Sequence, residues 1–296
     1  MDKIRVRVPA TSANLGSGFD CCGIALELYN IFEYEKLEKG LEFVGCPQEF
    51  ANEDNLAYLA YKAVCDRIGV PSNVKISIID TGVPVSRGLG SSATLICSGA
   101  YAANKLHGMP LSKNEIFEIC TELEGHPDNV APALFGSFCV SVTDMRGNPY
   151  TVRTHVSKRI HFTALIPDFE VQTHHAREVL PEMVKREDAV YNMSRVALLA
   201  SAFKSGDSEL LAIVTKDRLH QQYRRPLFKN IDEIEKCAME CGAISFMISG
   251  AGSTCLCLST KPIEEKLNKK ICSLPNGWVA RELMVSKNGT KEVELC

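Results

Sequence analysis

The segment PVSRGLGSSAT, residues 84–94, places glycines and hydroxyl side chains between a strand-like and a helix-like run. Gly88 and Gly90 permit positive φ angles and let a ligand approach the backbone amides closely. The hydroxyls that follow, ending at Thr94, add hydrogen-bond donors where a helix is expected to begin, and a helix N-terminus attracts anions. The segment therefore predicts a phosphate-binding loop, with an ordinary turn and helix cap as the alternative.

Two other glycine-rich motifs fit this spacing less well. A Walker A loop ends in Gly-Lys-Ser/Thr, and no such triplet follows a glycine at the required distance. Gly88, Gly90 and Ala93 satisfy the G-x-G-x-x-A form of the dinucleotide fingerprint. Residues 83–87, however, separate them from the preceding strand, and no acidic residue ends a second strand about 20 residues later. Both readings are therefore disfavoured.

Hydrophobic periodicity predicts mixed helices and strands around this loop. Residues 54–68 place apolar side chains on one helical face, with Asp54 as N-cap and Gly69 as a stop signal. The two prolines of 126–138 indicate a break between a helix and a strand. Further helices are expected at 95–106, 114–125, 178–184, 188–203, 208–223, 229–242 and 263–274, and strands at 4–8, 74–80, 138–143, 161–167, 243–249, 254–260 and 278–286.

The arrangement of these segments indicates an α+β chain with two lobes, because strands and helices do not alternate regularly. The polar, turn-rich stretch 144–160 is the predicted boundary, which divides the chain into domains 1–155 and 156–296. No internal repeat is present.

Composition argues against several classes of partner. Lys and Arg number 33 against 36 Asp and Glu, so the net charge of -3 predicts no nucleic-acid or membrane partner. No run approaches the roughly 18 apolar residues of a membrane span, and a cytosolic protein is expected. The 13 cysteines form no C-x-x-C pair, so they are interpreted as reduced core residues, with metal binding by a pair such as Cys237 and Cys241 as the alternative.

The segment at 84–94 resembles the phosphate-binding motif P-x-x-x-G-L-G-S-S-A of the GHMP kinases. Two further blocks are similar to segments of this family: PATSANLGSGFD at 9–20, and ISGAGSTCLCL at 248–258, which matches the block that buttresses the phosphate loop. The resemblance implies an N-terminal lobe like the second domain of ribosomal protein S5, a ferredoxin-like C-terminal lobe, and ATP between them. The residues it assigns to ATP are Pro84, Gly88, Leu89, Gly90, Ser91, Ser92 and Ala93.

Within the family, the chain most resembles the members that act on homoserine, through ANLGSGFD, EGHPDNVAPALFG, T-x-x-AREVLP and DRLHQQYR. This implies ATP-dependent phosphorylation of the homoserine hydroxyl to O-phosphohomoserine, on the route to threonine. An amino-acid alcohol needs a cation for its carboxylate and polar groups for its ammonium and hydroxyl. The resemblance assigns the carboxylate to Arg177 and Arg224 (or Arg225), the hydroxyl end to Asn14 and Asp20, and further contacts to His126 and Asp128.

The resemblance also implies a Mg²⁺ ion beside Ser92. Its acidic partner is Glu122 or Glu124, and Glu122 is favoured because it precedes a leucine as in related sequences. Asn129 stands where mevalonate kinase and galactokinase carry an aspartate base, and an amide does not accept a proton as a carboxylate does. We therefore expect no side-chain base, with the hydroxyl oriented by the substrate residues and its proton passing to the γ-phosphate or solvent.

Two alternatives remain open at this stage. A sibling kinase would phosphorylate threonine or an isoprenoid precursor, and a non-catalytic protein would keep the fold without turnover. Many members of the family form dimers, and a homodimer is an expectation that no residue of the sequence specifies.

Overall fold

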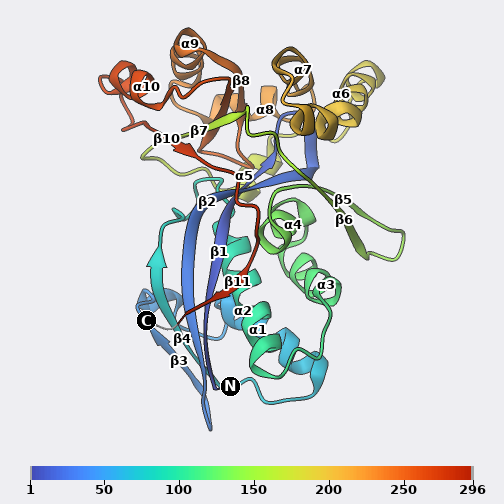
Figure 1. Ribbon diagram of the computed structural model, residues 1–296, viewed down its shortest axis with the longest axis vertical. Helices are drawn as coiled ribbons and strands as arrows, with labels where there is room; N and C mark the ends of the chain where they lie inside the picture. The colour runs from blue at the N-terminus through green and yellow to red at the C-terminus, as the bar shows by residue number, and fades with distance from the viewer. Residues whose placement is uncertain (1, 295–296) are drawn as a thin grey trace.

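The computed structural model describes residues 2–294, whose strands form two sheets that define a lower and an upper lobe in Figure 1. Within those residues the first sheet has the order β11-β1-β2-β4-β3, with β5 paired to β2 and β6 paired to β5. The second has the order β10-β7-β9-β8. The second sheet begins with β7 (His161–Ile166), a few residues after the predicted boundary at 155.

The lower sheet is organised around two long antiparallel strands. Lys3 lies opposite Glu35 at one end and Asn14 opposite Gly18 at the other, so the pair carries the chain from the base of the lower lobe to the junction with the upper one. The alternation predicted at 4–8 is confirmed, because its apolar side chains are buried. The strands are β1 (Lys3–Asn14), β2 (Gly18–Lys36), β3 (Leu41–Val44), β4 (Val74–Thr81), β5 (Phe138–Thr143), β6 (Pro149–Thr154) and β11 (Lys291–Val293).

Four helices cover one face of this sheet: α1 (Leu56–Ile68), α2 (Ser91–Leu106), α3 (Lys113–Glu124) and α4 (Pro127–Phe135). Helices α2 and α4 pack directly on β1, and α1 and α3 pack against α2. Asn55 rather than the predicted Asp54 caps α1, because its side chain accepts a hydrogen bond from the amide of Ala57 at 3.0 Å. Gly69 ends the helix with a left-handed φ of 73°, as predicted.

The upper sheet has the topology of a split β-α-β unit. Its strands β7, β8 (Ala243–Ile248), β9 (Cys255–Ser259) and β10 (Val279–Leu283) follow the β-α-β-β-α-β chain order of ferredoxin-like folds. Helices α9 (Ile231–Cys241) and α10 (Glu264–Ile271) pack together on β8 and β10. The remaining elements are η1 (Gln48–Phe50), α5 (Thr173–Glu178), α6 (Arg186–Ser205), α7 (Ser208–Val214), α8 (Gln221–Arg224) and η2 (Arg225–Leu227).

The junction between the lobes is a continuous apolar core. It joins residues of β1, β2 and β5 to residues of α6, α7 and the upper sheet. Phe138 and Phe203 face each other across it with ring centroids 4.9 Å apart. Separation of the two lobes would expose this apolar surface to water, which is unfavourable, so the interface fixes the lobes relative to each other. Side chains contributed by opposite lobes can therefore be held at defined distances.

Three further sequence predictions, each for a helix or a break, are wrong. Residues 126–138 contain helix α4, because Pro127 occupies its first turn, where a backbone N–H is not needed. The helix predicted at 178–184 does not form, and the helix of this region, α5, ends at Glu178. The helix predicted at 208–223 is divided into α7 and α8 by a turn at residues 215–220.

The predicted boundary segment 144–160 contains strand β6. This strand pairs with β5, and the two form a hairpin that projects from the side of the molecule (Figure 1). The C-terminal segment then leaves the upper lobe and pairs with β1, where Arg5 lies opposite Val293. The chain thus returns to its first lobe through β11.

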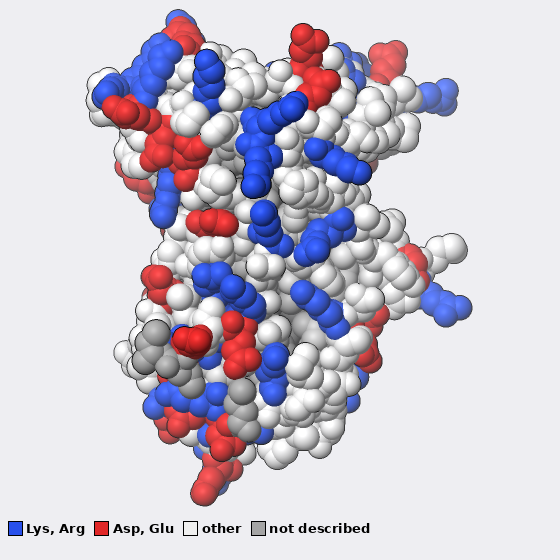
Figure 2. All heavy atoms as spheres, in the orientation of Figure 1, with Lys and Arg blue, Asp and Glu red and all other residues white. Residues whose placement is uncertain are grey.

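Charge is unevenly distributed over the surface. Figure 2 shows lysine and arginine side chains gathered through the middle of one face, over the junction of the lobes, with acidic groups above and below. The near balance of charge in the sequence does not reveal this arrangement. No helix of residues 2–294 is long and apolar enough to cross a membrane.

Candidate active site

The loop that connects β4 to α2 has a backbone that only glycine adopts easily. Gly88 and Gly90 have φ angles of 71° and 69°. A Cβ atom at Gly90 would overlap the Thr11 hydroxyl, and one at Gly88 would overlap the carbonyl oxygen of Ser249. Gly90 is also the N-cap of α2, and no side chain of the described residues 2–294 caps the start of this helix by a hydrogen bond. The first amides of α2 therefore remain available to an anion.

Segments from both lobes hold the carbonyl groups of this loop. The Ser249 hydroxyl donates to the carbonyl of Gly88 at 2.6 Å, and the amide of Thr254 donates to that of Arg87 at 3.0 Å. From β1, the amide of Thr11 donates to the carbonyl of Leu89 at 3.0 Å. Because the carbonyls are already bonded on one side, the loop amides are left to face a ligand on the other.

Glu124, and not the favoured Glu122, is the carboxylate next to the loop. The Ser92 hydroxyl donates to Glu124 Oε1 at 2.6 Å, whereas the side chain of Glu122 is exposed on α3. Burial raises the pKa of Glu124, and the hydrogen bond from Ser92 opposes this rise. The physical reason for the correction is helical geometry, because two residues of separation place the carboxylates on different faces of α3.

The acceptor side of the site contains an ion pair across the two lobes. Both terminal nitrogens of Arg177 on α5 donate to the two carboxylate oxygens of Asp20 on β2, at 3.0 and 3.1 Å. Asn14 Nδ2 donates to the carbonyl of Gly250 at 2.8 Å, and Asn14 Oδ1 accepts from the amide of Asp20 at 3.1 Å. Both Asn14 and Asp20 have positive φ angles, so this turn is held in a strained conformation.

A histidine–aspartate pair lies at the start of α4. His126 Nδ1 is 2.6 Å from Asp128 Oδ1, and Asp128 is 3% exposed. Burial acts to lower the pKa of His126, but the hydrogen bond and charge of Asp128 outweigh it and raise that pKa. Asn129 Oδ1 accepts a hydrogen bond from the Thr11 hydroxyl at 2.7 Å. Asn129 is thereby placed beside the phosphate loop as a neutral amide.

Arg224 and Arg225 face different surroundings. Arg224 is 2% exposed, and burial is the largest influence on its pKa, which it lowers. The nearby charge of Asp20 acts to raise this pKa, and that of Arg177 acts to lower it. Arg225 instead pairs with Asp232 and, at 2.8 Å, with Glu235 on α9. Arg224 is therefore the arginine that belongs to the acceptor side.

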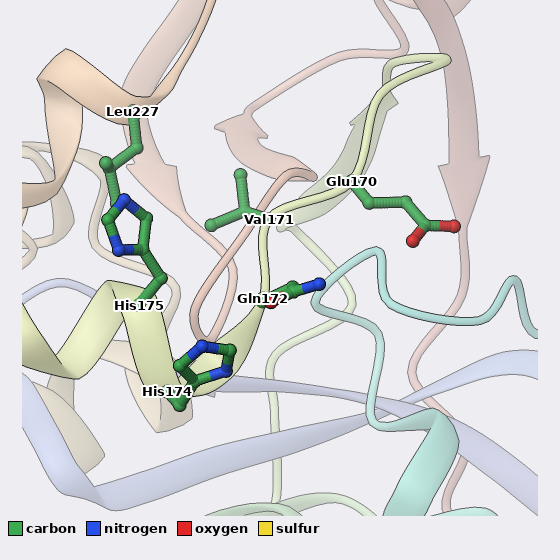
Figure 3. A pocket seen from close by; sticks show the side chains of 6 residues that line it. All are labelled: Glu170, Val171, Gln172, His174, His175 and Leu227. Atoms are coloured by element: carbon green, nitrogen blue, oxygen red, sulfur yellow. The ribbon is translucent and has the colours of Figure 1, made fainter.

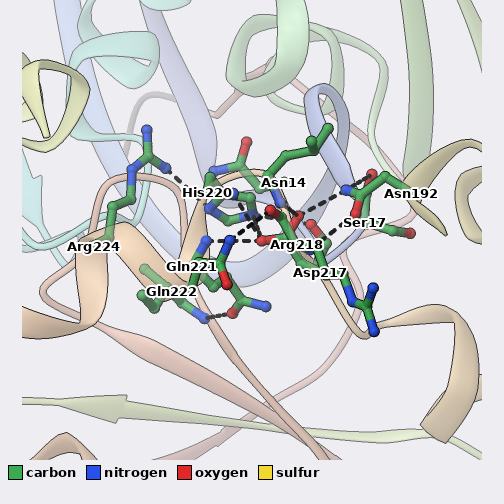
Figure 4. Close-up of polar contacts among 12 residues, drawn as sticks. Asn14, Ser17, Asn192, Asp217, Arg218, His220, Gln221, Gln222 and Arg224 are labelled. Carbon is green, nitrogen blue, oxygen red and sulfur yellow. Dashed lines mark hydrogen bonds and ion pairs between the residues drawn. The ribbon is translucent and has the colours of Figure 1, made fainter. Parts of the chain in front are cut away.

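The sequence analysis assigned no role to several residues that support this site. Thr11 and Ser249 bond to the phosphate loop, and His220 and Asp217 lie behind Arg224 (Figure 4). All four lie inside the blocks that carry the family resemblance, and Asp217 and His220 are specified positions of the DRLHQQYR block, but no role was assigned to any of them. A buried position for His220 could have been suspected from its helical spacing of four residues from Arg224.

A surface hollow of about 440 Å³ lies beside the start of α5. Its lining is Glu170, Val171, Gln172, His174, His175 and Leu227 (Figure 3). It holds none of the predicted site residues, and it adjoins the site through Glu170, which pairs with Arg87 of the phosphate loop at 2.9 Å. Asp20 and Arg177, which form the ion pair of the acceptor side, do not line this hollow.

Comparison with known proteins agrees with this geometry. The family model described as "GHMP kinases N terminal domain" matches residues 55–137, and that described as "GHMP kinases C terminal" matches residues 199–274. The chain belongs to the GHMP kinase family, and the predicted two-lobed α+β fold is confirmed.

Several of its relatives within the family are homoserine kinases. The chain is 43% identical over 291 residues to the homoserine kinase of Clostridium botulinum (strain 657 / Type Ba4), covering 97% of each chain. It is 46% identical over 267 residues to that of Clostridium beijerinckii, covering 90% of this chain and 89% of the relative. The crystal structure of homoserine kinase from Cytophaga hutchinsonii superposes with a TM-score of 0.89 at 26% identity, covering 99% of this chain and 98% of that one.

Proposed function

We propose that this protein transfers the γ-phosphoryl group of ATP to the side-chain hydroxyl of L-homoserine, which gives O-phospho-L-homoserine and ADP on the route to threonine. The observation that carries the proposal is a shared turn at residues 249–250. Ser249 bonds to the phosphate loop, and the carbonyl of Gly250 accepts from both Asn14 and Arg224 of the acceptor side. One turn therefore fixes the distance between donor and acceptor, which is the main requirement of phosphoryl transfer.

The ATP phosphates bind at the loop residues 84–93 and the N-terminus of α2. Backbone amides and the positive end of the helix dipole neutralise part of their charge. The Ser92 hydroxyl and the Glu124 carboxylate supply oxygen ligands of the kind that Mg²⁺ prefers, and such a site needs few protein ligands because the phosphates provide others. Bound Mg²⁺ would neutralise charge that develops on the transferred group.

The substrate carboxylate binds between Arg177 and Arg224. In the structure both terminal nitrogens of Arg177 are occupied by Asp20, so an incoming carboxylate competes with Asp20 for the guanidinium. Asp20 is then freed to accept hydrogen bonds from the hydroxyl or ammonium group of homoserine. Asn14 holds the turn at residues 14–20 by accepting a hydrogen bond from the amide of Asp20. His126 and Asp128 add polar contacts at the start of α4.

No side chain is assigned as a general base. Asn129 is an amide whose oxygen already accepts from Thr11, so it does not remove the hydroxyl proton. The proton passes to the γ-phosphate or to solvent, as expected for a loose transition state in which positioning dominates.

The test is ADP release by the purified protein with ATP and Mg²⁺ over a panel of homoserine, threonine, serine and mevalonate. We expect homoserine to have the largest kcat/KM, by roughly 10²-fold or more over the other alcohols. A good substrate must place its carboxylate between Arg177 and Arg224 and its hydroxyl next to the γ-phosphate at the same time. A preference for mevalonate or threonine would replace the proposal with a sibling kinase. Absence of ADP release with every alcohol would indicate a non-catalytic protein.

A further inference from the structure

His220 is a fully buried histidine that the chemistry proposed above does not use. Its side chain is 0% exposed, and its ring stacks on Phe19 at 5.0 Å between centroids, next to Asp20 in sequence. Nε2 lies 3.0 Å from the carbonyl oxygen of Gly16, and Nδ1 lies 3.3 Å from Nη1 of Arg224. The ring therefore connects the turn that carries Asn14 and Asp20 to the buried arginine (Figure 4).

The two partners of the ring determine its protonation. A guanidinium nitrogen only donates, so Nδ1 of His220 must accept from Arg224. A carbonyl oxygen only accepts, so Nε2 must carry the proton that is donated to Gly16. Both conditions hold only for the neutral imidazole with its proton on Nε2.

The charges around the ring agree with a neutral state. Burial is the largest influence and lowers the pKa of His220, and the charge of Arg224 acts in the same direction. Asp217, whose Oδ2 lies 3.7 Å from Nε2, and Asp20 act to raise it. The carboxylate of Asp217 is already occupied, because it accepts from Asn192 Nδ2 and from the backbone amides of residues 219, 220 and 221, just before and at the start of α8.

Arg224 is held by three acceptors. Its Nε donates to the carbonyl of Ala176 at 2.9 Å, and Nη1 donates to the carbonyl of Gly250 at 3.0 Å and to His220. These contacts fix the plane of the guanidinium. Within residues 2–294 Nη2 has no hydrogen-bond partner, so the planar group presents one unoccupied nitrogen.

We propose that neutral His220 is a positioning residue for homoserine: it orients Arg224 toward the substrate carboxylate and ties the turn at Gly16 to that arginine, without touching either substrate. The inference rests on the proposed function, since the carboxylate is the ligand of Arg224. It assigns His220 to the acceptor side only. The hydrogen bonds of the His220 ring go to Gly16 and Arg224 and to no residue of the loop at 84–93, so we expect its loss to change ATP binding little.

Two substitutions separate the roles of the ring nitrogens. His220→Asn keeps an acceptor near the position of Nδ1 and loses the donor to Gly16. His220→Gln keeps a donor near Nε2 and loses the acceptor for Arg224. We expect His220→Gln to raise the KM for homoserine roughly 10- to 100-fold, because the buried, charged Nη1 of Arg224 loses one of its two acceptors. His220→Asn should raise it less, and the KM for ATP should stay within about twofold in both.

His161→Asn is the matched control, since it also removes an imidazole with a hydrogen-bonded Nδ1, at the partly exposed pair with Glu282 in the upper lobe. It should leave both KM values unchanged. Equal losses for homoserine and ATP in the His220 variants, or a KM for homoserine within twofold of the unchanged protein, would overturn the proposal.

A measurement on the unaltered protein covers the case in which the variants fold poorly. Nitrogen-15 NMR at pH 7 should show His220 with a protonated Nε2 and an unprotonated Nδ1. A proton on Nδ1, alone or together with Nε2, contradicts the proposal. If homoserine is not a substrate, the proposed function fails, and the tautomer of His220 is still measured independently.

Discussion

The two halves of the active site are built by different means. The phosphate half is one continuous stretch, residues 84–93, whose backbone conformation requires glycine at two positions. The acceptor half is assembled from side chains that are distant in sequence: Asp20 and Arg177, which form its central ion pair, are 157 residues apart. Backbone amides recognise a phosphate in any nucleotide, whereas long side chains recognise a particular acceptor.

This difference predicts different responses to mutation. An added methyl group in the phosphate half collides with backbone or a buried hydroxyl and leaves no room for adjustment. A changed side chain in the acceptor half removes one of several contacts and leaves the others in place. Losses should therefore be nearly complete in the first half and graded in the second.

The largest effect is expected from Gly90→Ala. The new Cβ would overlap Thr11 Oγ1 at a residue with a positive φ, so the loop must move by about 1 Å or more. Misplacement of this size costs roughly 10²-fold in rate, and ATP affinity should fall with it. The measurement is kcat/KM for ATP at saturating homoserine.

Gly108→Ala is the control for backbone strain alone. Gly108 has a φ of 85°, but nothing lies within 4 Å of the position of its Cβ. This variant should lose about 1 kcal/mol of stability and keep its activity. Comparable activity losses in the two variants would show that strain, not the shape of the phosphate loop, is responsible.

A second comparison concerns the two glutamates of α3. Glu124→Gln should lower kcat roughly 10- to 100-fold and raise the Mg²⁺ concentration needed for half-maximal activity, because the carboxylate that accepts from Ser92 is lost. Glu122→Gln should leave both quantities unchanged, because that side chain is exposed. If only Glu122→Gln alters the Mg²⁺ dependence, the assignment of the metal site is wrong.

These glutamates show where sequence reasoning reaches its limit. The phosphate loop was predictable because its residues are adjacent, and their types alone define a bend and a helix start. The choice between Glu122 and Glu124 depends on how α3 is rotated against α2, which is decided by packing of side chains such as Phe117 and Ile96 in the core. No local pattern specifies that rotation.

Arg224 and Arg225 illustrate the same limit. They are neighbours in sequence, yet one is buried behind the acceptor side and the other pairs with α9. Helix α4 was missed for the opposite reason, because its prolines look like breaks although Pro127 lies in the permissive first turn. The short strand β11 pairs with β1 across almost the whole chain length, and nearby residues carry no sign of that partner.

A third comparison tests the graded behaviour of the acceptor half. Arg177→Gln removes a guanidinium that faces Asp20 across the lobes and should raise the KM for homoserine about tenfold, with little change in the KM for ATP. Arg225→Gln removes an arginine of similar exposure that contacts only the upper lobe, and its KM values should not change. An Arg225 variant impaired for homoserine would reverse the choice between Arg224, the last residue of α8, and Arg225, the first residue of η2.

The smallest effect is a pH dependence of stability at the edge of the acceptor half. The folded pKa of His126 is raised by Asp128, so its contribution to stability is fully present below the unfolded value of about 6.5 and is lost as pH rises through the folded value. The thermal midpoint of the unchanged protein should exceed that of His126→Gln by about 2 °C at pH 5.5, corresponding to about 1 kcal/mol, and the difference should shrink toward pH 8.

The pKa of His107, in the same lobe, is shifted in the opposite direction to that of His126. Burial lowers its pKa, so the folded state resists protonation and loses stability as pH falls below about 6.5. His107→Gln should therefore gain stability relative to the unchanged protein toward pH 5.5, where His126→Gln loses it. If both variants shift in the same direction, the two histidines respond to the net charge of the protein, and the hydrogen bond between His126 and Asp128 does not determine the pH profile.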